Sequence, residues 1–226
     1  MSMKTILDFF LRLSQNNNKL WFDAHRAEYE ALKKRHLSVF AMDFVQGVED
    51  FDPRCHGLQL RDVTYRINRD IRFSNDKSPY KHWYGVYVCP RGKKSGMAGY
   101  YIHLEPATDT YFICAGLYNP TKEVLGSVRE QIMLEPDEFH DAVVACGKGF
   151  ELNWDNALKR MPVGWSENDR HSEYYRLKSY EICKPLTKDD VLDKDFLPKA
   201  LKELRKCQPF NEILNRCVDY LDPVTR

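Results

Sequence analysis

The chain has 226 residues, of which 43% are hydrophobic and 30% are charged. This composition excludes intrinsic disorder, and the length suffices for a substantial core. Lys and Arg (34) nearly balance Asp and Glu (33), so the formal net charge is +1. Such a balance argues against a protein that binds nucleic acid through its overall charge, but it leaves room for a local basic patch.

The first residues are apolar but lack the features of a signal peptide. Asp8 and Arg12 interrupt the apolar stretch, and no small-residue cleavage site follows. Apolar runs elsewhere fall short of a membrane span. We therefore expect a cytoplasmic protein with no membrane partner.

Seven cysteines are widely spaced, and none forms a Cys-x-x-Cys pair. We expect them to be reduced and to act mostly as small hydrophobic residues, with no structural metal and no cofactor. They are Cys55, Cys89, Cys114, Cys146, Cys183, Cys207 and Cys217.

Residues 1–50 predict two amphipathic helices. Apolar residues recur every three or four positions from about Thr5 to Ser14, and again from about Lys19. An asparagine within residues 16–18 is placed to cap the second helix, and Asp52-Pro53 ends it.

From about residue 58 to 116 the period changes to that of strands. Four segments are rich in β-branched and aromatic residues, and the short links between the later ones, such as Arg91–Gly96 and Ala107–Asp109, predict antiparallel pairing. These segments are Val63–Asn68, Trp83–Cys89, Tyr100–Glu105 and Tyr111–Gly116. Tyr100, Ile102 and Leu104 share one parity and are expected to face the helices.

Residues 120–221 are mainly helical. Pro120 and Pro136 each suit the first turn of a helix, Thr187–Asp190 resembles a capping box, and Gln208-Pro209 separates two C-terminal helices. Two shorter elements are a helix at His171–Leu177 and a strand at Ser179–Cys183, whereas residues 150–170 show no clear pattern. Together the elements predict a single α+β domain over residues 1–226, with a central antiparallel sheet flanked by N-terminal and C-terminal helices.

The segment from Tyr65 to Lys81 differs from the rest of the chain because basic and aromatic residues alternate in it. Its cations could hold a phosphate or carboxylate, and its rings could stack on a ligand. We therefore predict ligand-binding residues at Arg66, Arg69, Arg72, Phe73, Lys77, Tyr80 and Lys81. The alternative is a structural network in which these cations pair with Asp62, Asp70, Asp76 and Glu105.

Acid–base candidates lie in and near this segment. Asp70 and Asp76 could orient the arginines or act as a base. His103 and Glu105 lie two apart on a predicted strand and so share a face, where a His–carboxylate pair could exchange protons. The alternative is an ordinary solvated sheet face.

Several motifs, in order along the chain, resemble an uncharacterised and mostly bacterial family known as domain of unknown function 2461. The resemblance implies a single α+β unit and supplies no activity, cofactor or catalytic residue; the basic tip Arg91–Ser95 departs from the family pattern. The matching motifs are Asn16–Asn18 with Trp21-Phe22, Arg69–Lys81, Tyr100–Pro106, Gly116–Pro120 and Leu158–Trp165.

Three functions remain open from the sequence. The first is binding of a small anionic ligand at the segment Arg66–Lys81, with or without acid–base chemistry. The second is a nucleic-acid-binding module that uses the same segment together with Lys93 and Lys94. The third is a structural or interaction domain in which the arginines only lock helices onto the sheet.

Overall fold

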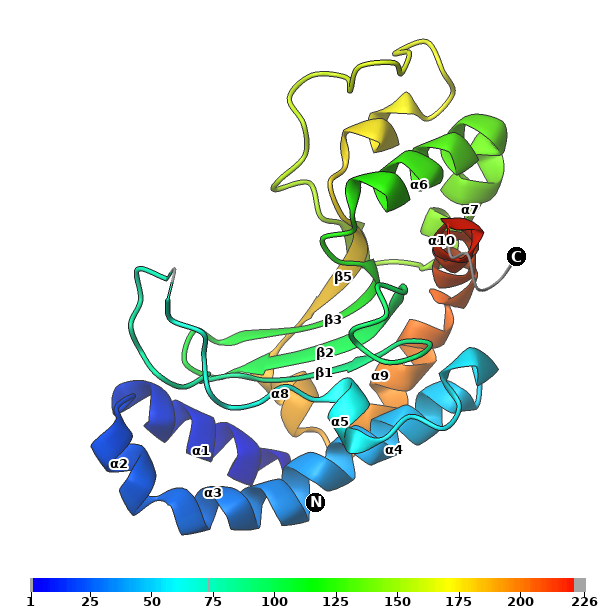
Figure 1. Ribbon diagram of the computed structural model, residues 1–226. Coiled ribbons are helices and arrows are strands. Elements are labelled where there is room, and N and C mark those ends of the chain that lie inside the picture. Colours follow the sequence, from blue (N-terminus) through cyan, green and yellow to red (C-terminus); the bar gives the residue numbers. More distant parts are fainter. Residues whose placement is uncertain (1, 73, 222–226) are drawn as a thin grey trace.

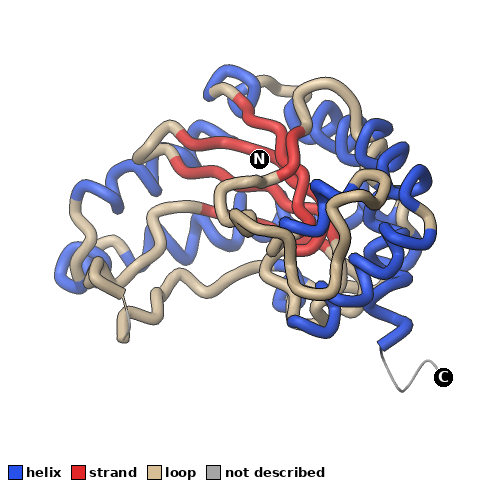
Figure 2. The backbone as a smooth tube through the Cα atoms, turned by 90° about the horizontal axis from the view of Figure 1, so that it is seen from above, coloured by secondary structure: helices blue, strands red, loops and turns tan. Residues whose placement is uncertain are grey.

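The fold is built on one five-stranded antiparallel sheet, and the α+β prediction is confirmed (Figure 1). The computed structural model describes residues 2–72 and 74–221. The strands lie in the order β1-β2-β3-β5-β4. Seen from above, they are gathered near the centre of the molecule (Figure 2). Their bounds are β1 Tyr84–Val88, β2 Gly99–Glu105, β3 Thr110–Leu117, β4 Glu151–Leu152 and β5 Tyr180–Leu186.

Helices cover one face of this sheet. Tyr100, Ile102 and Leu104 of β2 are at most 1% exposed and point to that face, as the alternation predicts. Helices α1, α4, α9 and α10 pack there, and Figure 1 shows α1, α4 and α9 below the strands and α10 to their right. Their bounds are α1 Met3–Gln15, α4 Ser38–Glu49, α9 Phe196–Arg205 and α10 Gln208–Leu221.

The second predicted helix is divided in the structure. It consists of α2 (Lys19–Ala24), α3 (Arg26–Leu32), a π-helical segment η1 (Lys33–Leu37) and α4. The divide between α2 and α3 falls at His25, whose ring stacks on Trp21 at 3.9 Å between ring centroids. Asn18 caps α2 by accepting a hydrogen bond from the Trp21 amide, as predicted.

The C-terminal helices begin close to the predicted places. The box at Thr187 and Asp190 caps α8 (Lys188–Leu192), and a short 3₁₀ helix, η3, spans Ser172–Arg176. Helices α6 (Lys122–Leu134) and α7 (Pro136–Ala145) precede them, with Thr121 rather than Asn119 as the cap of α6. The strand β4 was not predicted, because it has only two residues.

The predicted strand Val63–Asn68 is wrong. A capping box between Gln59 and Asp62 starts a helical turn instead, α5 (Leu60–Val63), after a 3₁₀ turn η2 at Pro53–Cys55. Beyond α5 the segment forms no continuous strand and makes two isolated bridges, Thr64 to Val86 and Asn68 to Tyr80.

The expectation that every cysteine is reduced is also wrong. Cys114 on β3 and Cys183 on β5 lie directly opposite each other and form a disulfide. The pairing depends on strand register across 69 residues of sequence, which spacing alone does not reveal. The other five cysteines are buried thiols. Among residues 2–72 and 74–221, no helix is both long and apolar enough to span a bilayer.

Candidate functional site

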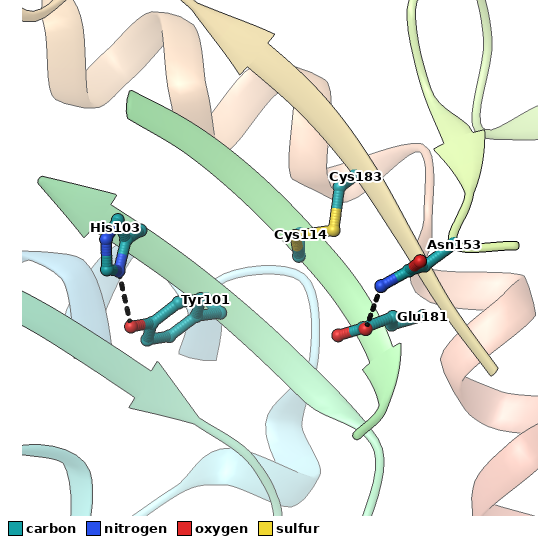
Figure 3. Close-up of a disulfide and its surroundings, with 6 residues drawn as sticks. All are labelled: Tyr101, His103, Cys114, Asn153, Glu181 and Cys183. Atoms are coloured by element: carbon teal, nitrogen blue, oxygen red, sulfur yellow. Dashed lines mark hydrogen bonds between the residues drawn. A yellow bond between two sulfur atoms is a disulfide. The ribbon is translucent and has the colours of Figure 1, made fainter. Parts of the chain in front are cut away.

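The face of the sheet opposite the four packed helices carries polar and aromatic side chains. Strand register places Tyr101 and His103 of β2 beside Cys114 and Phe112 of β3 on this face. Figure 3 shows Tyr101, His103 and the disulfide from this region of the sheet. These residues alternate with the core residues of the same strands, so the strand geometry itself brings them together.

His103 is held by a chain of polar contacts on this face. Its Nδ1 lies 2.9 Å from the Tyr101 hydroxyl, and its Nε2 lies 3.2 Å from a Glu105 oxygen. The other Glu105 oxygen lies 3.1 Å from Nδ1 of His82. Burial lowers the pKa of His103, so the neutral ring is favoured. A neutral ring in these contacts donates from Nε2 to Glu105 and accepts at Nδ1 from Tyr101.

Aromatic rings enclose His103 on both sides. The Phe112 ring stacks on it at 4.6 Å, and the Trp83 indole lies 5.2 Å away between ring centroids. His103 is consequently only 9% exposed. The predicted pairing of His103 with Glu105 is present, but both ring nitrogens are already engaged and the ring faces are covered.

Gly85 gives Tyr101 the space for its contact with His103. A Cβ atom at Gly85 would lie 2.4 Å from the Tyr101 hydroxyl oxygen and 2.9 Å from two ring carbons. The two residues are on adjacent strands, β1 and β2, and the Tyr101 ring leans across the glycine. Burial raises the pKa of Tyr101, which keeps its hydroxyl protonated as a donor.

The segment Arg66–Lys81 forms a loop whose charges mostly pair with one another. Arg69 binds Asp76, and Arg72 binds Asp70 at 2.6 Å. The hydrogen bonds from Arg72 hold the pKa of Asp70 below its ordinary range. The pKa of Asp76 is likewise lowered, by hydrogen bonds from Ser78 and then from Arg69. These pairs match part of the structural alternative, although Glu105 contacts histidines instead.

The two predicted lysines of this loop bind backbone carbonyls. Lys77 donates to the carbonyl of Ile71 at 3.1 Å. Lys81 donates to the carbonyls of Arg66 at 2.6 Å and Asn68 at 2.8 Å, so it ties the base of the loop together. Burial and then the charges of Arg66 and Arg69 lower the pKa of Lys81.

The two predicted stacking residues have different outcomes. Phe73 lies outside the described residues. Tyr80 is 5% exposed and stacks on Phe22 at 4.1 Å, so its ring belongs to the core rather than to a ligand site. Asn17 fixes Tyr80 through two hydrogen bonds to its backbone, of 2.8 and 3.1 Å. This contact gives the asparagine run at 16–18 a structural role.

A small cavity opens at the base of the loop. Residues 65–67, between the bridges at Thr64 and Asn68, belong to no strand and leave this part of β1, an edge strand of the sheet, without a paired neighbour on that side. The space of about 40 Å³ is partly open to solvent and has room for one or two water-sized groups. It is lined by Phe10, Tyr29, Lys33, Leu37, Ser38, Leu60, Thr64, Tyr65, Arg66, Ile67, Lys81, Trp83, Tyr84 and Gly85.

The charged residues of the cavity lining are all basic. They are Lys33, Arg66 and Lys81, and no acidic side chain is among the described residues that line the space. Lys33 was not predicted, because it lies on the separate helical region; the π-helical turn η1 carries it to the cavity. The Tyr84 hydroxyl donates to the carbonyl of Leu37 at 2.7 Å and joins this turn to the edge strand.

The predicted site is therefore divided in the structure. Arg66 and Lys81 reach the cavity, whereas the other predicted residues that the structure describes do not line it. The Trp83 indole lines the cavity and also packs against His103, so it lies between the cavity and the His103–Glu105 pair. Those that do not line the cavity are Arg69, Asp70, Arg72, Asp76, Lys77, Tyr80, His103 and Glu105.

A family model described as conserved hypothetical protein (DUF2461) matches residues 5–212. The chain belongs to this family. Neither the curated proteins nor the solved structures gave a significant match. Membership in DUF2461 therefore rests on a match that includes the whole sheet, the loop and the cavity, and it assigns no ligand to them.

Proposed function

We propose that this DUF2461 protein binds a small anionic ligand, bearing a phosphate or a carboxylate, at the cavity beside β1. The observation that carries the proposal is the lining of three basic side chains, Lys33, Arg66 and Lys81, without an acidic one among the described lining residues. Cations gathered in this way repel each other, and a bound anion offsets the repulsion.

The electrostatics of Lys81 support this reading. The charges of Arg66 and Arg69 contribute to its lowered pKa, after burial. Two of its three N–H groups donate to backbone carbonyls. Its ammonium also lies 5.9 Å from the centre of the Trp83 ring. An anion at the cavity would therefore meet a lysine that is already held in place.

The cavity dimensions restrict how such a ligand binds. A space of about 40 Å³ admits only one or two oxygen atoms of a phosphate or carboxylate. The rest of the ligand would lie outside the cavity, next to Tyr65. Tyr65 is 41% exposed, and its ring packs edge-on against the Trp83 ring. Because Trp83 lies between the cavity and His103, the arrangement supports binding rather than an acid–base reaction.

The test is a titration of the purified protein with inorganic phosphate, a nucleoside monophosphate and a dicarboxylate, followed by calorimetry and thermal unfolding. A ligand at a hundred times its Kd should stabilise the fold by about 2.7 kcal/mol. Arg66→Gln and Lys33→Gln should each weaken binding by about 10- to 100-fold, which corresponds to the loss of a charge-assisted hydrogen bond.

The matched control is Arg61→Gln. The side chain of Arg61 is 81% exposed and is near in sequence to Arg66, but it does not line the cavity. Arg61→Gln should therefore leave the affinity for the anion unchanged at constant ionic strength. If no anion of the panel stabilises the protein, or if Arg66→Gln binds as well as the wild type, the proposal is wrong. A short oligonucleotide whose binding is weakened by Lys93→Gln or Lys94→Gln would instead support the nucleic-acid alternative, because neither lysine lines the cavity.

A further inference from the structure

The disulfide Cys114–Cys183 lies on the sheet face opposite the four packed helices, rather than in the core beneath it. Strand register puts Cys114 opposite Tyr101 on one side and opposite Cys183 on the other. Cys114 is 4% exposed, whereas Cys183 is half-buried, with only the two-residue strand β4 beyond it. Cys183 is therefore the more exposed residue of the two.

A carboxyl group accompanies the disulfide on the same face. Glu181 precedes Cys183 by two residues on β5, so both side chains point the same way, as Figure 3 shows. On β3 the residue opposite Glu181 is Gly116, two residues after Cys114. Since Gly116 has no side chain, nothing from that position of β3 separates the Glu181 carboxyl from Cys114.

Glu181 is held in place by a neutral partner. Asn153 Nδ2 donates to Glu181 Oε1 at 2.8 Å, and the Asn153 amide donates to the Glu181 carbonyl at 3.1 Å. Burial raises the pKa of Glu181, so it keeps its proton to a higher pH than an exposed carboxyl does. A positioned carboxyl of this kind can give a proton to a sulfur and take it back.

We propose that Cys114 and Cys183 are a redox-active pair that exchanges with small thiols and disulfides, with Glu181 as the proton donor and acceptor. In the reductive direction, a thiolate attacks Sγ of Cys183, and the bond between the two protein sulfurs breaks. Its electron pair goes to Sγ of Cys114, which takes the proton of Glu181. A second thiolate then attacks the small-molecule sulfur of the mixed disulfide, which releases the Cys183 thiolate.

The two protons that the attacking thiols release to water return to the Cys183 thiolate and to the Glu181 carboxylate. Two thiols are thus oxidised to one small disulfide, and the protein disulfide is reduced to two thiols. Oxidation by a small disulfide follows the reverse course, in which Glu181 removes the proton from Cys114. Asn153 remains hydrogen-bonded to the carboxylate after its proton has left.

The first experiment traps the thiols of the native protein, purified without reductant, after incubation in mixtures of reduced and oxidised glutathione. A maleimide label and peptide mass spectrometry should show that only Cys114 and Cys183 change state, reversibly and without denaturant. If the pair is reduced only under conditions that unfold the chain, the disulfide is structural and the proposal is wrong. The same holds if the two cysteines are thiols in protein prepared without reductant.

The second experiment tests Glu181 with a matched control. Glu181→Gln should slow reduction by dithiothreitol at least tenfold and change the pH profile of the rate. Glu151→Gln removes the exposed carboxyl opposite Cys183 on β4 and should leave both unchanged. Other titratable groups on this face are Tyr87, which interacts electrostatically with Glu181, Tyr101, which is hydrogen-bonded to His103, and Tyr118, which interacts with Tyr101; burial raises the pKa of Tyr87 and of Tyr101.

Two further variants keep the outcome decisive. If Glu181→Gln does not fold, Asn153→Ala leaves the carboxyl in place, removes its hydrogen bond from Asn153 and should also shift the pH profile; it also removes the bond that Asn153 Oδ1 accepts from the Asp155 amide. Cys114→Ser leaves the accessible Cys183, which should form a mixed disulfide with oxidised glutathione faster than Cys114 does in Cys183→Ser. Faster mixed-disulfide formation in Cys183→Ser than in Cys114→Ser would overturn the proposed roles of the cysteines. Reduction rates that are unchanged in both Glu181→Gln and Asn153→Ala would overturn the proposed role of Glu181.

Discussion

Replacing Asn215 with alanine should destabilise the fold strongly. Asn215 of α10 is 1% exposed; its side chain accepts from the Ala98 amide at 2.7 Å and donates to the Ala98 carbonyl at 3.1 Å. The variant leaves both backbone groups without these partners in a buried place. Each such loss costs about 1–3 kcal/mol, so we expect about 2–6 kcal/mol in total. That is a large share of the 5–15 kcal/mol typical of a folded domain.

Urea unfolding followed by circular dichroism measures this loss. The midpoint should fall while the dependence on urea stays the same, because the folded and unfolded surfaces hardly change. In thermal unfolding, each kcal/mol should lower Tm by about 2–4 °C. Asn211→Ala is the matched control: one turn earlier on α10, the Asn211 Nδ2 donates to the Gly99 carbonyl at 2.9 Å, whereas its Oδ1 accepts no hydrogen bond from the described residues. If Asn215→Ala lowers the free energy of unfolding no more than Asn211→Ala does, the argument from the two hydrogen bonds of Asn215 is refuted.

Two other predictions concern the face that carries His103. Gly85→Ala should lower the free energy of unfolding, measured in urea, by about 1–3 kcal/mol, because the added Cβ displaces Tyr101. In a protein that already carries Tyr101→Ala, Gly85→Ala should cost much less. An equal cost in both backgrounds would contradict the argument. Burial lowers the pKa of His103 below its ordinary 6.5, so the unfolded chain binds the proton more readily than the folded one. The stability that is present above pH 6.5 should therefore be lost as the pH falls through the lower pKa of the folded state. The pH dependence of the free energy of unfolding should be flatter there in His103→Gln, whereas an equal slope would show that His103 is not its source.

The elements that the sequence predicts well are those whose pattern comes from a single buried face. The strand β2 alternates because helices cover only one side of the sheet, and α1 repeats every three or four residues because one of its faces is packed. The π-helical turn Lys33–Leu37 could not be predicted from such a pattern. Its residues are ordinary helix formers, and the tertiary contact to its Leu37 carbonyl comes from Tyr84, 47 residues later.

The false strand at Val63–Asn68 has a different cause. Its β-branched and aromatic residues favour a strand, but the box formed by Gln59 and Asp62 commits the preceding residues to a helical turn. Because the helical turn ends only at Val63, the residues that follow it pair with β1 at a single isolated bridge, Thr64 to Val86. The gap in this pairing is where the cavity lies, so the error in the predicted strand and the missed cavity share one origin.

The candidate site was partly visible in the sequence. The basic segment could be recognised, but the pairing of Arg69 with Asp76 and of Arg72 with Asp70 depends on how the loop folds back. Lys33 reaches the cavity from a distant helix, and the Cys114–Cys183 pairing depends on the register of β3 and β5. Each of these features requires the three-dimensional arrangement of segments far apart in the chain.

The two proposed sites are linked by one layer of rings, yet they can be tested separately. Tyr65 contacts Trp83, Trp83 contacts His103, and His103 stacks on Phe112, with ring centroids 5.9, 5.2 and 4.6 Å apart. Trp83 lines the cavity at one end, and Tyr101 stands opposite Cys114 at the other. His103, in the middle of the layer, is packed between rings and hydrogen-bonded at both nitrogens. Arg66 lines the cavity at one end, and Glu181 lies on β5 two residues from Cys183 at the other, so the two substitutions change different sites and failure of one proposal leaves the evidence for the other intact.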